Sequence, residues 1–340
     1  MTILYQLPAF PVEEQLKSVV SILEEKLPPG APRGVQFYLG QTRNGLLSVD
    51  AVKDVIQRTI PSQYQNSFHL PFASRYVDSQ CRLDEPASEA FLGQYLALAQ
   101  DLGCKTVLVH TGTTYYHPLA TLPEGVDRKY QWGVRSPEDL ESSKHEVYRR
   151  LHAIAVQYPN LDVALENAPL PMNNTSGIDP KKAFLNNMVT TADQIKNFID
   201  YAKCTVENLG LCLDTNHYLR MLSAMALYEH QDPEIRGMFA AIGRREDTNL
   251  PTLTDALLSG GRLFIVQFAD NNGWELGKRD VRAIAPSRNP YQLRSVIRMI
   301  QENEREIPVS FDVDETDYVA RPHQRRTLDW ILSGVETPIE

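Results

Sequence analysis

The sequence predicts a single (β/α)₈ barrel that spans residues 1–340. Eight short apolar, β-rich runs alternate with longer segments of helical period, which is the pattern of repeated strand–helix units. No run is joined to the next by a short Asn-Gly hairpin turn, so the strands are expected to pair in parallel through right-handed crossovers. A doubly wound sheet is the competing architecture, but eight units in 340 residues favour the barrel.

The predicted elements follow one another along the whole chain without a Pro/Gly/Ser-rich linker, which favours one domain. The strand runs are Thr2–Leu7, Gly34–Leu39, Ser67–Phe72, Thr106–His110, Leu161–Glu166, Gly210–Asp214, Leu263–Phe268 and Pro308–Val313. The helix candidates are Glu13–Lys26, Val49–Ile60, Ala87–Leu102, Ser136–Tyr158, Thr191–Cys204, Leu253–Ser259, Pro290–Glu304 and Pro322–Leu332.

Proline and glycine mark several helix ends. Pro137 and Pro290 each follow a capping residue and are expected at the first helical position, where the missing N–H costs nothing. Gly103 follows Leu102 and is typical of a helix C-terminus placed just before a strand.

Composition indicates an ordinary globular protein. Hydrophobic residues make up 42% and charged residues 23% of the chain, and the net charge of −9 argues against unspecific nucleic-acid binding. The N-terminal segment lacks a signal-peptide pattern, and no run is long enough for a membrane span. The four cysteines, at 81, 104, 204 and 212, show no CxxC spacing, so we expect reduced thiols and a cytoplasmic location.

Polar residues stand at the ends of six of the predicted strands, where a barrel gathers its catalytic groups. They are His69, His110, Glu166, Asp214, Gln267 and Asp312. Ionisable groups within apolar strands are costly to desolvate unless they are paired or bind a cation. Their repetition in successive strands therefore predicts a shared divalent-metal site.

Each of these residues also has a structural interpretation. A lone strand-end histidine such as His69 is more often hydrogen-bonded than catalytic, whereas Glu166 and Asp214 each require a counter-charge. Oxygen ligands suit Mn²⁺, Mg²⁺ or Co²⁺, and Zn²⁺ becomes plausible if His69 and His110 join them. Cys212 shares the inward face with Asp214 and is expected to be a small core residue.

At these residues the chain resembles the xylose-isomerase-like barrel superfamily, which holds sugar isomerases, ketose 3-epimerases, inosose dehydratases and apurinic endonucleases. Glu166-Asn167 is similar to the family's strand-end Glu-Asn, and Asp214-Thr215-Asn216-His217 is similar to its Asp-x-x-His. Gln267-Phe268-Ala269-Asp270 stands where the family has His-x-x-Asp, and Asp312 stands where a strand commonly ends in Glu.

The resemblance implies that Glu166, Asp214, Gln267 and Asp312 surround one metal ion. It also implies that Glu166 and Asp312 transfer protons and that His217 holds a substrate hydroxyl or carbonyl. Asp270 would be a further substrate-binding residue.

Two positions depart from the family pattern. Gln267 replaces a histidine ligand and offers an amide oxygen instead. Asp312 replaces glutamate and withdraws the carboxylate by roughly 1.5 Å, which bears directly on proton transfer because that step demands close geometry.

His69 and His110 are similar to the early-strand histidines that hold a zinc cluster in apurinic endonucleases. That subfamily also carries an Asp-x-His pair after the seventh strand, where this chain reads Arg279-Asp280-Val281-Arg282. A full trinuclear cluster is therefore not expected, although a second metal or a substrate contact at His69 and His110 remains open.

Three functions follow from this pattern. The first is a metal-dependent isomerase or epimerase that acts on a polyhydroxylated small molecule by enediolate proton transfer. The second is a metal-dependent hydrolase that uses His69, His110 and Glu166 in a dinuclear site. The third is a barrel that has lost turnover and binds a metabolite or partner, an alternative kept open by Gln267 and Asp312.

Two long segments after strands are expected to shape the pocket. Residues 113–135 carry aromatic side chains that either stack on sugar faces or pack the segment, and residues 170–189 carry Lys181 and Lys182. Arg279 and Arg282 either bind a phosphate or carboxylate or belong to an exposed charged loop. Barrels of this superfamily often assemble, so a homo-oligomer is also considered.

Overall fold

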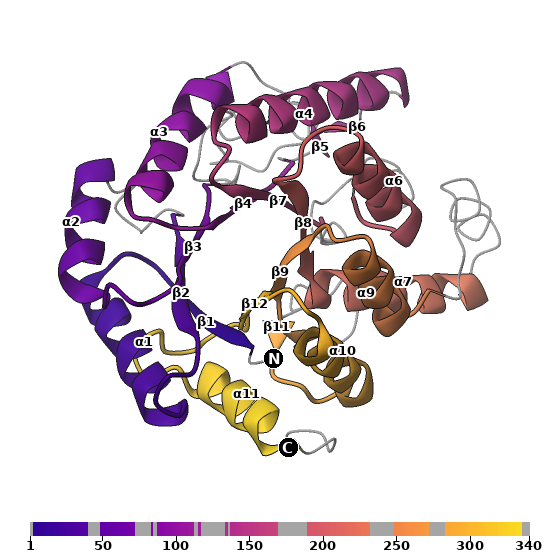
Figure 1. Cartoon of the computed structure of the whole chain (residues 1–340). Helices are drawn as coiled ribbons and strands as arrows, with labels where there is room; N and C mark the ends of the chain where they lie inside the picture. Colours follow the sequence, from indigo (N-terminus) through magenta and orange to yellow (C-terminus); the bar gives the residue numbers. More distant parts are fainter. Residues whose placement is uncertain are drawn as a thin grey trace, which may run out of the picture.

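The central structure is a closed barrel of eight parallel strands (Figure 1). The computed structural model describes residues 3–39, 48–71, 83, 87–111, 115–116, 133–134, 137–168, 189–231, 248–271 and 283–334. The barrel strands are β1 (Leu4–Ala9), β2 (Arg33–Tyr38), β3 (Ser67–His69), β4 (Thr106–Val109), β7 (Asp162–Glu166), β8 (Leu209–Asp214), β9 (Leu263–Gln267) and β12 (Pro308–Ser310). Each strand pairs with the next in sequence, and β12 pairs with β1. The predicted (β/α)₈ barrel is therefore confirmed.

Helices surround the strands on the outside of the barrel (Figure 1). They are α1 (Glu13–Lys26), α2 (Val49–Thr59), α3 (Ala87–Asp101), α4 (Pro137–Gln157), α6 (Ala192–Lys203), α7 (Thr215–Gln231), α9 (Leu250–Ser259), α10 (Pro290–Glu302) and α11 (Pro322–Ser333). The last helix returns to the first, because Lys26 of α1 pairs with Asp329 of α11 at 2.9 Å. This ion pair links the first and last helices of the barrel.

Helix α7 was not expected from the sequence. It begins at Thr215, directly after the last residue of β8, so strand and helix meet without a loop. The structure also adds two short antiparallel pairs outside the barrel, β5 (Tyr115–Tyr116) with β6 (Gly133–Val134) and β10 (Asp270–Asn271) with β11 (Ala283–Ile284). Two-residue strands are too short to show an alternating pattern.

Proline and glycine do mark helix ends as predicted. Pro137 and Pro290 are the first residues of α4 and α10. Gly103 adopts a φ of +67° two residues after α3 ends, a conformation that a residue without Cβ reaches at little cost. At the start of α6, Thr191 and Gln194 form a reciprocal capping box.

The barrel interior has an apolar side and a polar side. Leu108, Ala164, Cys212, Phe264 and Ile265 from β4, β7, β8 and β9 form a compact apolar cluster, which confirms Cys212 as a small core residue. The polar side is a hydrogen-bond network of four side chains. Ser67 donates to Gln6 at 2.7 Å, and Ser310 donates to Gln36 at 3.0 Å.

Two residues beyond this apolar cluster, β7 and β8 each present another inward side chain at the carboxyl end of the barrel. Because side chains alternate between the two faces of a strand, the residue two after Ala164 is Glu166 and the residue two after Cys212 is Asp214. The packed interior thus forms the floor below the predicted site residues.

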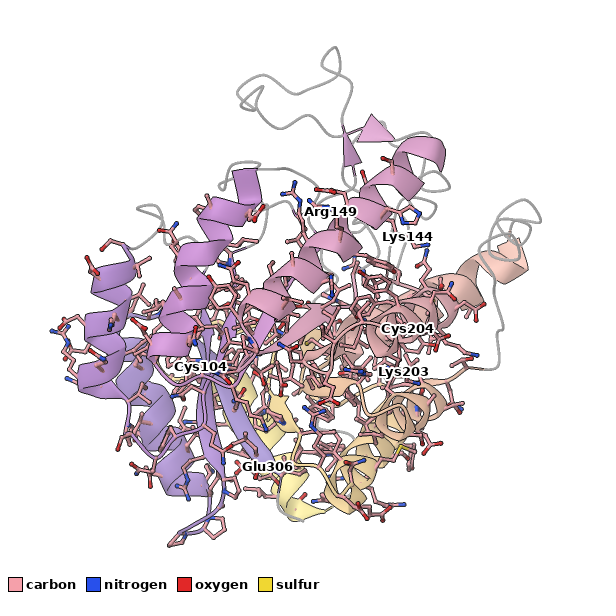
Figure 2. The ribbon with its side chains drawn as sticks, turned by 45° about the horizontal axis from the view of Figure 1, so that its top comes forward. Cys104, Lys144, Arg149, Lys203, Cys204 and Glu306 are labelled. Carbon is pink, nitrogen blue, oxygen red and sulfur yellow. The ribbon has the colours of Figure 1, made fainter. Side chains whose placement is uncertain are left out.

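The described cysteines are free thiols. Cys104 is buried between α3 and β4, and Cys204 is exposed directly after α6 (Figure 2). Among the helices of the described residues, none is both long and apolar enough to cross a membrane.

Candidate metal centre

The predicted strand-end residues meet at the carboxyl end of the barrel. The last residues of β3, β7, β8 and β9 are His69, Glu166, Asp214 and Gln267, whereas His110 lies one residue beyond β4 and Asp312 lies two beyond β12. The register places Asp214 directly beside Gln267 and Glu166 beside Cys212. Parallel strands all end on one rim, which is why residues from six separate segments share one space.

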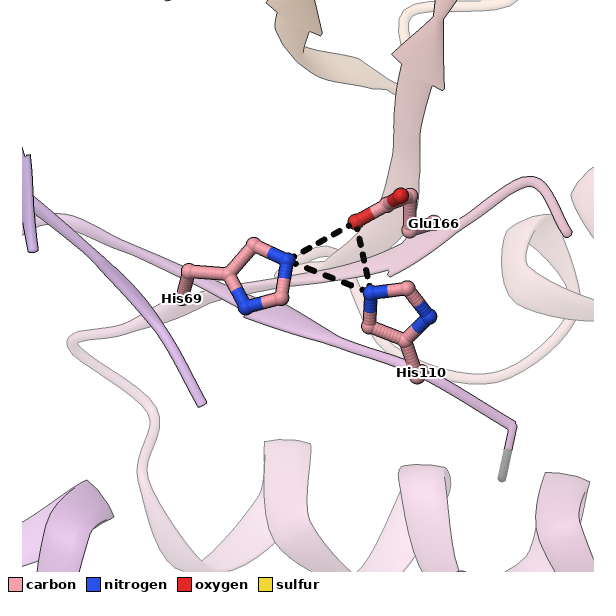
Figure 3. Close-up of side chains that lie close together, drawn as sticks. All are labelled: His69, His110 and Glu166. Carbon is pink, nitrogen blue, oxygen red and sulfur yellow. Dashed lines mark hydrogen bonds and ion pairs between the residues drawn. The ribbon is translucent and has the colours of Figure 1, made fainter. Parts of the chain in front are cut away.

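Two histidines and a glutamate form the first donor group (Figure 3). Oε2 of Glu166 lies 3.2 Å from Nε2 of His69 and 3.0 Å from Nε2 of His110, and the two Nε2 atoms are 3.1 Å apart. Nδ1 of His69 lies 3.1 Å from the carbonyl oxygen of Leu70, which can only accept a hydrogen bond. That contact keeps a proton on Nδ1, so Nε2 is the nitrogen that can bind a cation beside Glu166.

Glu166, Asp214 and His217 form the second donor group. Nδ1 of His217 donates to the backbone carbonyl of Asn167 at 2.8 Å, so its Nε2 faces Oδ2 of Asp214 at 3.3 Å. The other oxygen of Asp214 accepts the backbone N–H of His217 at 3.0 Å. Glu166 belongs to both donor groups because its Oε1 lies 3.4 Å from Nδ1 of His217.

Gln267 lies against the same carboxylate. Its terminal amide has one atom 3.0 Å from Oε2 of Glu166 and the other 3.0 Å from the hydroxyl of Tyr38. With the amide oxygen toward Glu166, the NH₂ group donates to Tyr38 and to Gln36. With the amide reversed, the NH₂ group donates to Glu166 instead. The first orientation brings two oxygens together and is favoured only when a cation lies between them.

Asp312 joins the cluster through Tyr38. The Tyr38 ring stacks on His69 with centroids 4.4 Å apart, and its hydroxyl hydrogen-bonds the Asp312 carboxylate. Burial, followed by the charges of Asp214 and Glu166, raises the pKa of Asp312 to about 7. Asp312 therefore lies in the electrostatic field of the same carboxylates.

The cluster divides protons unequally among its members. Burial alone would raise the pKa of Glu166, but His110 and His69 hold that pKa well below its usual range. Burial and the charge of Glu166 together raise the pKa of Asp214 well above its usual range. Burial would lower the pKa of His110, yet the Glu166 charge raises it, whereas burial does lower the pKa of His217. Without a cation, Glu166 is thus the anion, Asp214 and Asp312 favour their protonated forms, and His217 favours the neutral imidazole.

The donor set fits a divalent cation. Metal–ligand distances of about 2.0–2.2 Å hold adjacent ligand atoms roughly 3 Å apart, and the atoms around Oε2 of Glu166 are separated by 3.0–3.2 Å. Carboxylate and imidazole donors together suit Mn²⁺, Co²⁺ and Zn²⁺, and the carboxylates alone suit Mg²⁺. Because two groups share Glu166, the arrangement has donors for one ion or for two.

Asp270 has a different role from the other predicted residues. Its carboxylate is fully buried and accepts the backbone N–H groups of Asn271, Ser287, Arg288 and Asn289 at 2.7–2.9 Å, together with the Asn289 side chain. Asp270 therefore holds the segment that leads into α10, and its predicted contact with substrate gains no support from this geometry. Arg279, Arg282, Lys181 and Lys182 lie outside the described residues.

Sequence reasoning gave no role to several residues that build the centre. The Tyr38 hydroxyl hydrogen-bonds both Gln267 and Asp312. The Asn167 side chain hydrogen-bonds both the backbone N–H and the backbone carbonyl of Asp214, where β8 meets α7. Tyr38 could have been found from its position, since it is two residues after the inward Gln36 at a strand end. Arg220, a buried cation on α7, follows Asp214 by six residues and carried no such signal.

Solved structures resemble this chain over its full length. A D-tagatose 3-epimerase-like protein is 16% identical, with a TM-score of 0.52, and the match covers 97% of this chain and 99% of that one. The D-allulose 3-epimerase from Methylomonas sp. is 12% identical, with a TM-score of 0.56 and 98% of each chain covered. An AP endonuclease of family 2 from Brucella melitensis is 14% identical, with a TM-score of 0.53 and 98% of each chain covered.

These similarities establish the fold. The chain has the xylose-isomerase-like TIM-barrel fold that the sequence motifs indicate, and it shares that fold with both sugar epimerases and AP endonucleases. No protein-family model matches the sequence, and no curated protein matches it.

Proposed function

We propose that this protein is a divalent-metal-dependent isomerase or epimerase of a polyhydroxylated small molecule. The observation that carries the proposal is the convergence of Glu166, Asp214, Gln267 and Asp312 from four strand ends, with His217 beside them. Two sugar epimerases with the same fold are consistent with it.

Glu166, Asp214 and Gln267 would hold the metal ion, with Asp312 as a further carboxylate ligand. When bound, the ion polarises a substrate carbonyl and its neighbouring hydroxyl, which acidifies the C–H bond beside the carbonyl. Asn167 and the start of α7 hold Asp214 and His217 in place from behind. The imidazole of His217 would bind a substrate hydroxyl at the edge of the cluster.

Proton transfer would be performed by Glu166 and Asp312. One carboxylate oxygen removes the proton from the carbon beside the carbonyl, and the other carboxyl group returns a proton to the opposite face or to the adjacent carbon. The Tyr38 hydroxyl orients Asp312 by its hydrogen bond, which offsets part of the reach lost with the shorter aspartate side chain. The floor of Cys212 and Ala164 keeps water away from the carboxylates from below.

Elemental analysis and solvent exchange test this proposal. Protein loaded with Mn²⁺, Mg²⁺ or Co²⁺ is incubated in D₂O with neutral ketoses such as D-allulose, with ketose phosphates and with keto sugar acids, and NMR follows deuterium uptake at the carbons beside the carbonyl. We expect one ion per chain and deuterium uptake that is lost in Glu166→Gln and Asp312→Asn. The exposed Asp101→Asn is the matched control, because its carboxylate lies on α3 far from the rim. Bound metal without deuterium uptake from any ketose would refute proton transfer.

A second candidate is metal-dependent hydrolysis, and the His69–His110–Glu166 group is the observation that favours it. His69, His110 and Glu166 would hold one ion and Glu166, Asp214 and His217 would hold a second, and such a pair would supply an activated water molecule. An AP endonuclease shares the fold. Two zinc ions per chain, together with hydrolysis of bis(p-nitrophenyl) phosphate that is lost in His69→Ala, would favour this function over isomerisation.

A further inference from the structure

A buried arginine with unsatisfied N–H groups lies beside the candidate metal centre. Arg220 on α7 is 3% exposed, and neither its Nε nor its Nη2 has a hydrogen-bond partner. Burial lowers the pKa of this guanidinium to about 10, so it is still charged at neutral pH. A charged group that is desolvated without hydrogen bonds costs free energy, and native proteins retain few such groups.

The position of Arg220 on α7 directs its side chain toward the rim of the barrel. It is three residues after His217 and four after Asn216, so all three lie on neighbouring parts of one helix face. Helical side chains lean toward the N-terminus of their helix, and the N-terminus of α7 follows Asp214 directly. The charges of Asp214 and His217 interact with Arg220 accordingly.

Asn216 adds an acceptor beside these donors. It is 7% exposed, and its Oδ1 has no hydrogen-bond partner. An unsatisfied acceptor one helical turn from unsatisfied guanidinium donors matches a ligand that carries both a hydroxyl group and an anionic group. The buried Arg294 and Arg321 each also have an unpaired Nε, but their other guanidinium nitrogens donate to protein carbonyls, those of Arg294 to Ile331 and Trp330 and that of Arg321 to Pro8.

Asp214 does not satisfy the N–H groups of Arg220, because neither Nε nor Nη2 has a hydrogen-bond partner. The guanidinium would repel a metal ion held by Asp214 unless an anion lies between them.

We propose that Arg220 binds a carboxylate or phosphate group of the substrate, while Asn216 accepts a hydrogen bond from one of its hydroxyls. The substrate is then an acidic polyhydroxylated compound, a sugar acid or a sugar phosphate, and not a neutral sugar. This inference rests on the proposed function for the location of the reacting carbons. According to this proposal, residues of α7 distinguish an anionic substrate from a neutral one.

A matched set of polyols without a reactive carbonyl tests the inference. D-sorbitol is neutral, D-gluconate carries a carboxylate, and D-sorbitol 6-phosphate carries a phosphate. Isothermal titration calorimetry on metal-loaded protein is expected to show at least tenfold tighter binding of one of the two anionic polyols, and which of them binds identifies the anionic group. Equal affinity for all three polyols would overturn the inference.

Two variants of Arg220 separate recognition from folding. Arg220→Met removes the charge with little change in volume and is expected to abolish the preference for the anionic polyol, whereas Arg220→Lys keeps part of it. The control is Arg149→Gln, which removes the same charge from an exposed position on α4 (Figure 2) and should bind like the wild type. An Arg220→Met variant that keeps the full preference would contradict the assignment.

The melting temperature without ligand distinguishes a structural arginine from a binding one. If Arg220 binds substrate, Arg220→Met should melt at the same temperature as the wild type or higher, because an uncompensated buried charge is removed. A large fall in melting temperature in both Arg220 variants would show a structural role and overturn the inference. Metal content is measured on every variant. A chain without bound metal that still prefers the anionic polyol would refute the proposed function while leaving this assignment intact.

Discussion

Replacement of Asp312 by asparagine should stabilise the metal-free protein at neutral and alkaline pH. In the folded chain, burial and the neighbouring carboxylates raise the pKa of Asp312 from 3.8 to about 7. A folded-state pKa above the unfolded one means that stability is fully present below about pH 3.8 and is lost as the pH rises through 7. Ionised Asp312 therefore opposes folding, and Asp312→Asn removes that penalty.

The size of the effect follows from the same values. One pKa unit corresponds to about 1.4 kcal/mol, so the full change in pKa is worth on the order of 4 kcal/mol. Roughly 2.7 kcal/mol of this is lost between pH 5 and pH 8. Asp312 is only partly buried, and solvent screening halves the figure. We expect Asp312→Asn to gain about 1–2 kcal/mol relative to wild type between pH 5 and pH 8.

Urea unfolding with a chelator present, at pH 5 and at pH 8, measures this gain. Asp101→Asn removes an exposed carboxylate that pairs with Lys53, and its stability relative to wild type should change little over the same interval. A difference between wild type and Asp312→Asn that is the same at both pH values would refute the reasoning. Saturating Mn²⁺ should reverse the order of stability, because the ion binds the ionised carboxylate of the wild type.

Four further results are expected. Glu166→Gln should weaken metal binding by more than about 100-fold in equilibrium dialysis, since both donor groups lose their shared carboxylate. The control variant Asp162→Asn, at the opposite end of β7, should bind metal as the wild type does. Gln267→His should strengthen Zn²⁺ binding by on the order of tenfold, as imidazole is the better ligand, and unchanged affinity would remove Gln267 from the ligand set. Metal binding at pH 6 should release at least one proton per chain, detected by calorimetry in buffers of different ionisation enthalpy. Gly34→Ala should lower the free energy of unfolding by about 1–3 kcal/mol or more, because its Cβ would lie 1.7 Å from the carbonyl oxygen of Gln65; an unchanged urea midpoint would contradict this.

The sequence predicts the barrel because its strands are short, apolar and regularly spaced. The order of the eight strands and their parallel pairing follow from that spacing, and the predicted ends at Glu166 and Asp214 match the observed ends of β7 and β8. The predicted strand is too long where the apolar run continues beyond the last residue that pairs with a neighbouring strand. The run at 308–313 is one example, since β12 ends at Ser310 and Asp312 lies beyond it.

The sequence predicts those site residues that are the single polar side chain at the end of an apolar strand. Glu166 and Asp214 could be identified in this way because no other feature explains a carboxylate in an apolar strand. The dinuclear alternative already grouped His69 and His110 with Glu166, and the structure brings both imidazoles within 3.0–3.2 Å of Oε2 of Glu166. What the sequence could not show is that Glu166 also contacts His217, so that two donor groups meet at one carboxylate.

Residues that act through backbone contacts were beyond sequence reasoning. Asp270 lies three residues beyond β9, in the short strand β10, and backbone N–H groups from residues 287–289 satisfy its carboxylate. Only the fold of that segment distinguishes a buried capping carboxylate from a ligand. Arg220 is the opposite case, since an arginine within a helix has no periodic signal and its unsatisfied N–H groups are visible only in three dimensions.

Protons and a divalent cation compete for the same side chains of the candidate metal centre. Burial, together with the neighbouring carboxylate charges, raises the pKa of Asp214 and of Asp312, and the charge of Glu166 raises the pKa of His110. A divalent ion opposes these shifts, because it neutralises Glu166 and stabilises the ionised carboxylates. Metal affinity should therefore rise with pH through neutrality, and the Gln267 amide should turn its oxygen toward the ion as the protons leave. The barrel then gains stability from the same carboxylates that destabilise it when they ionise without metal.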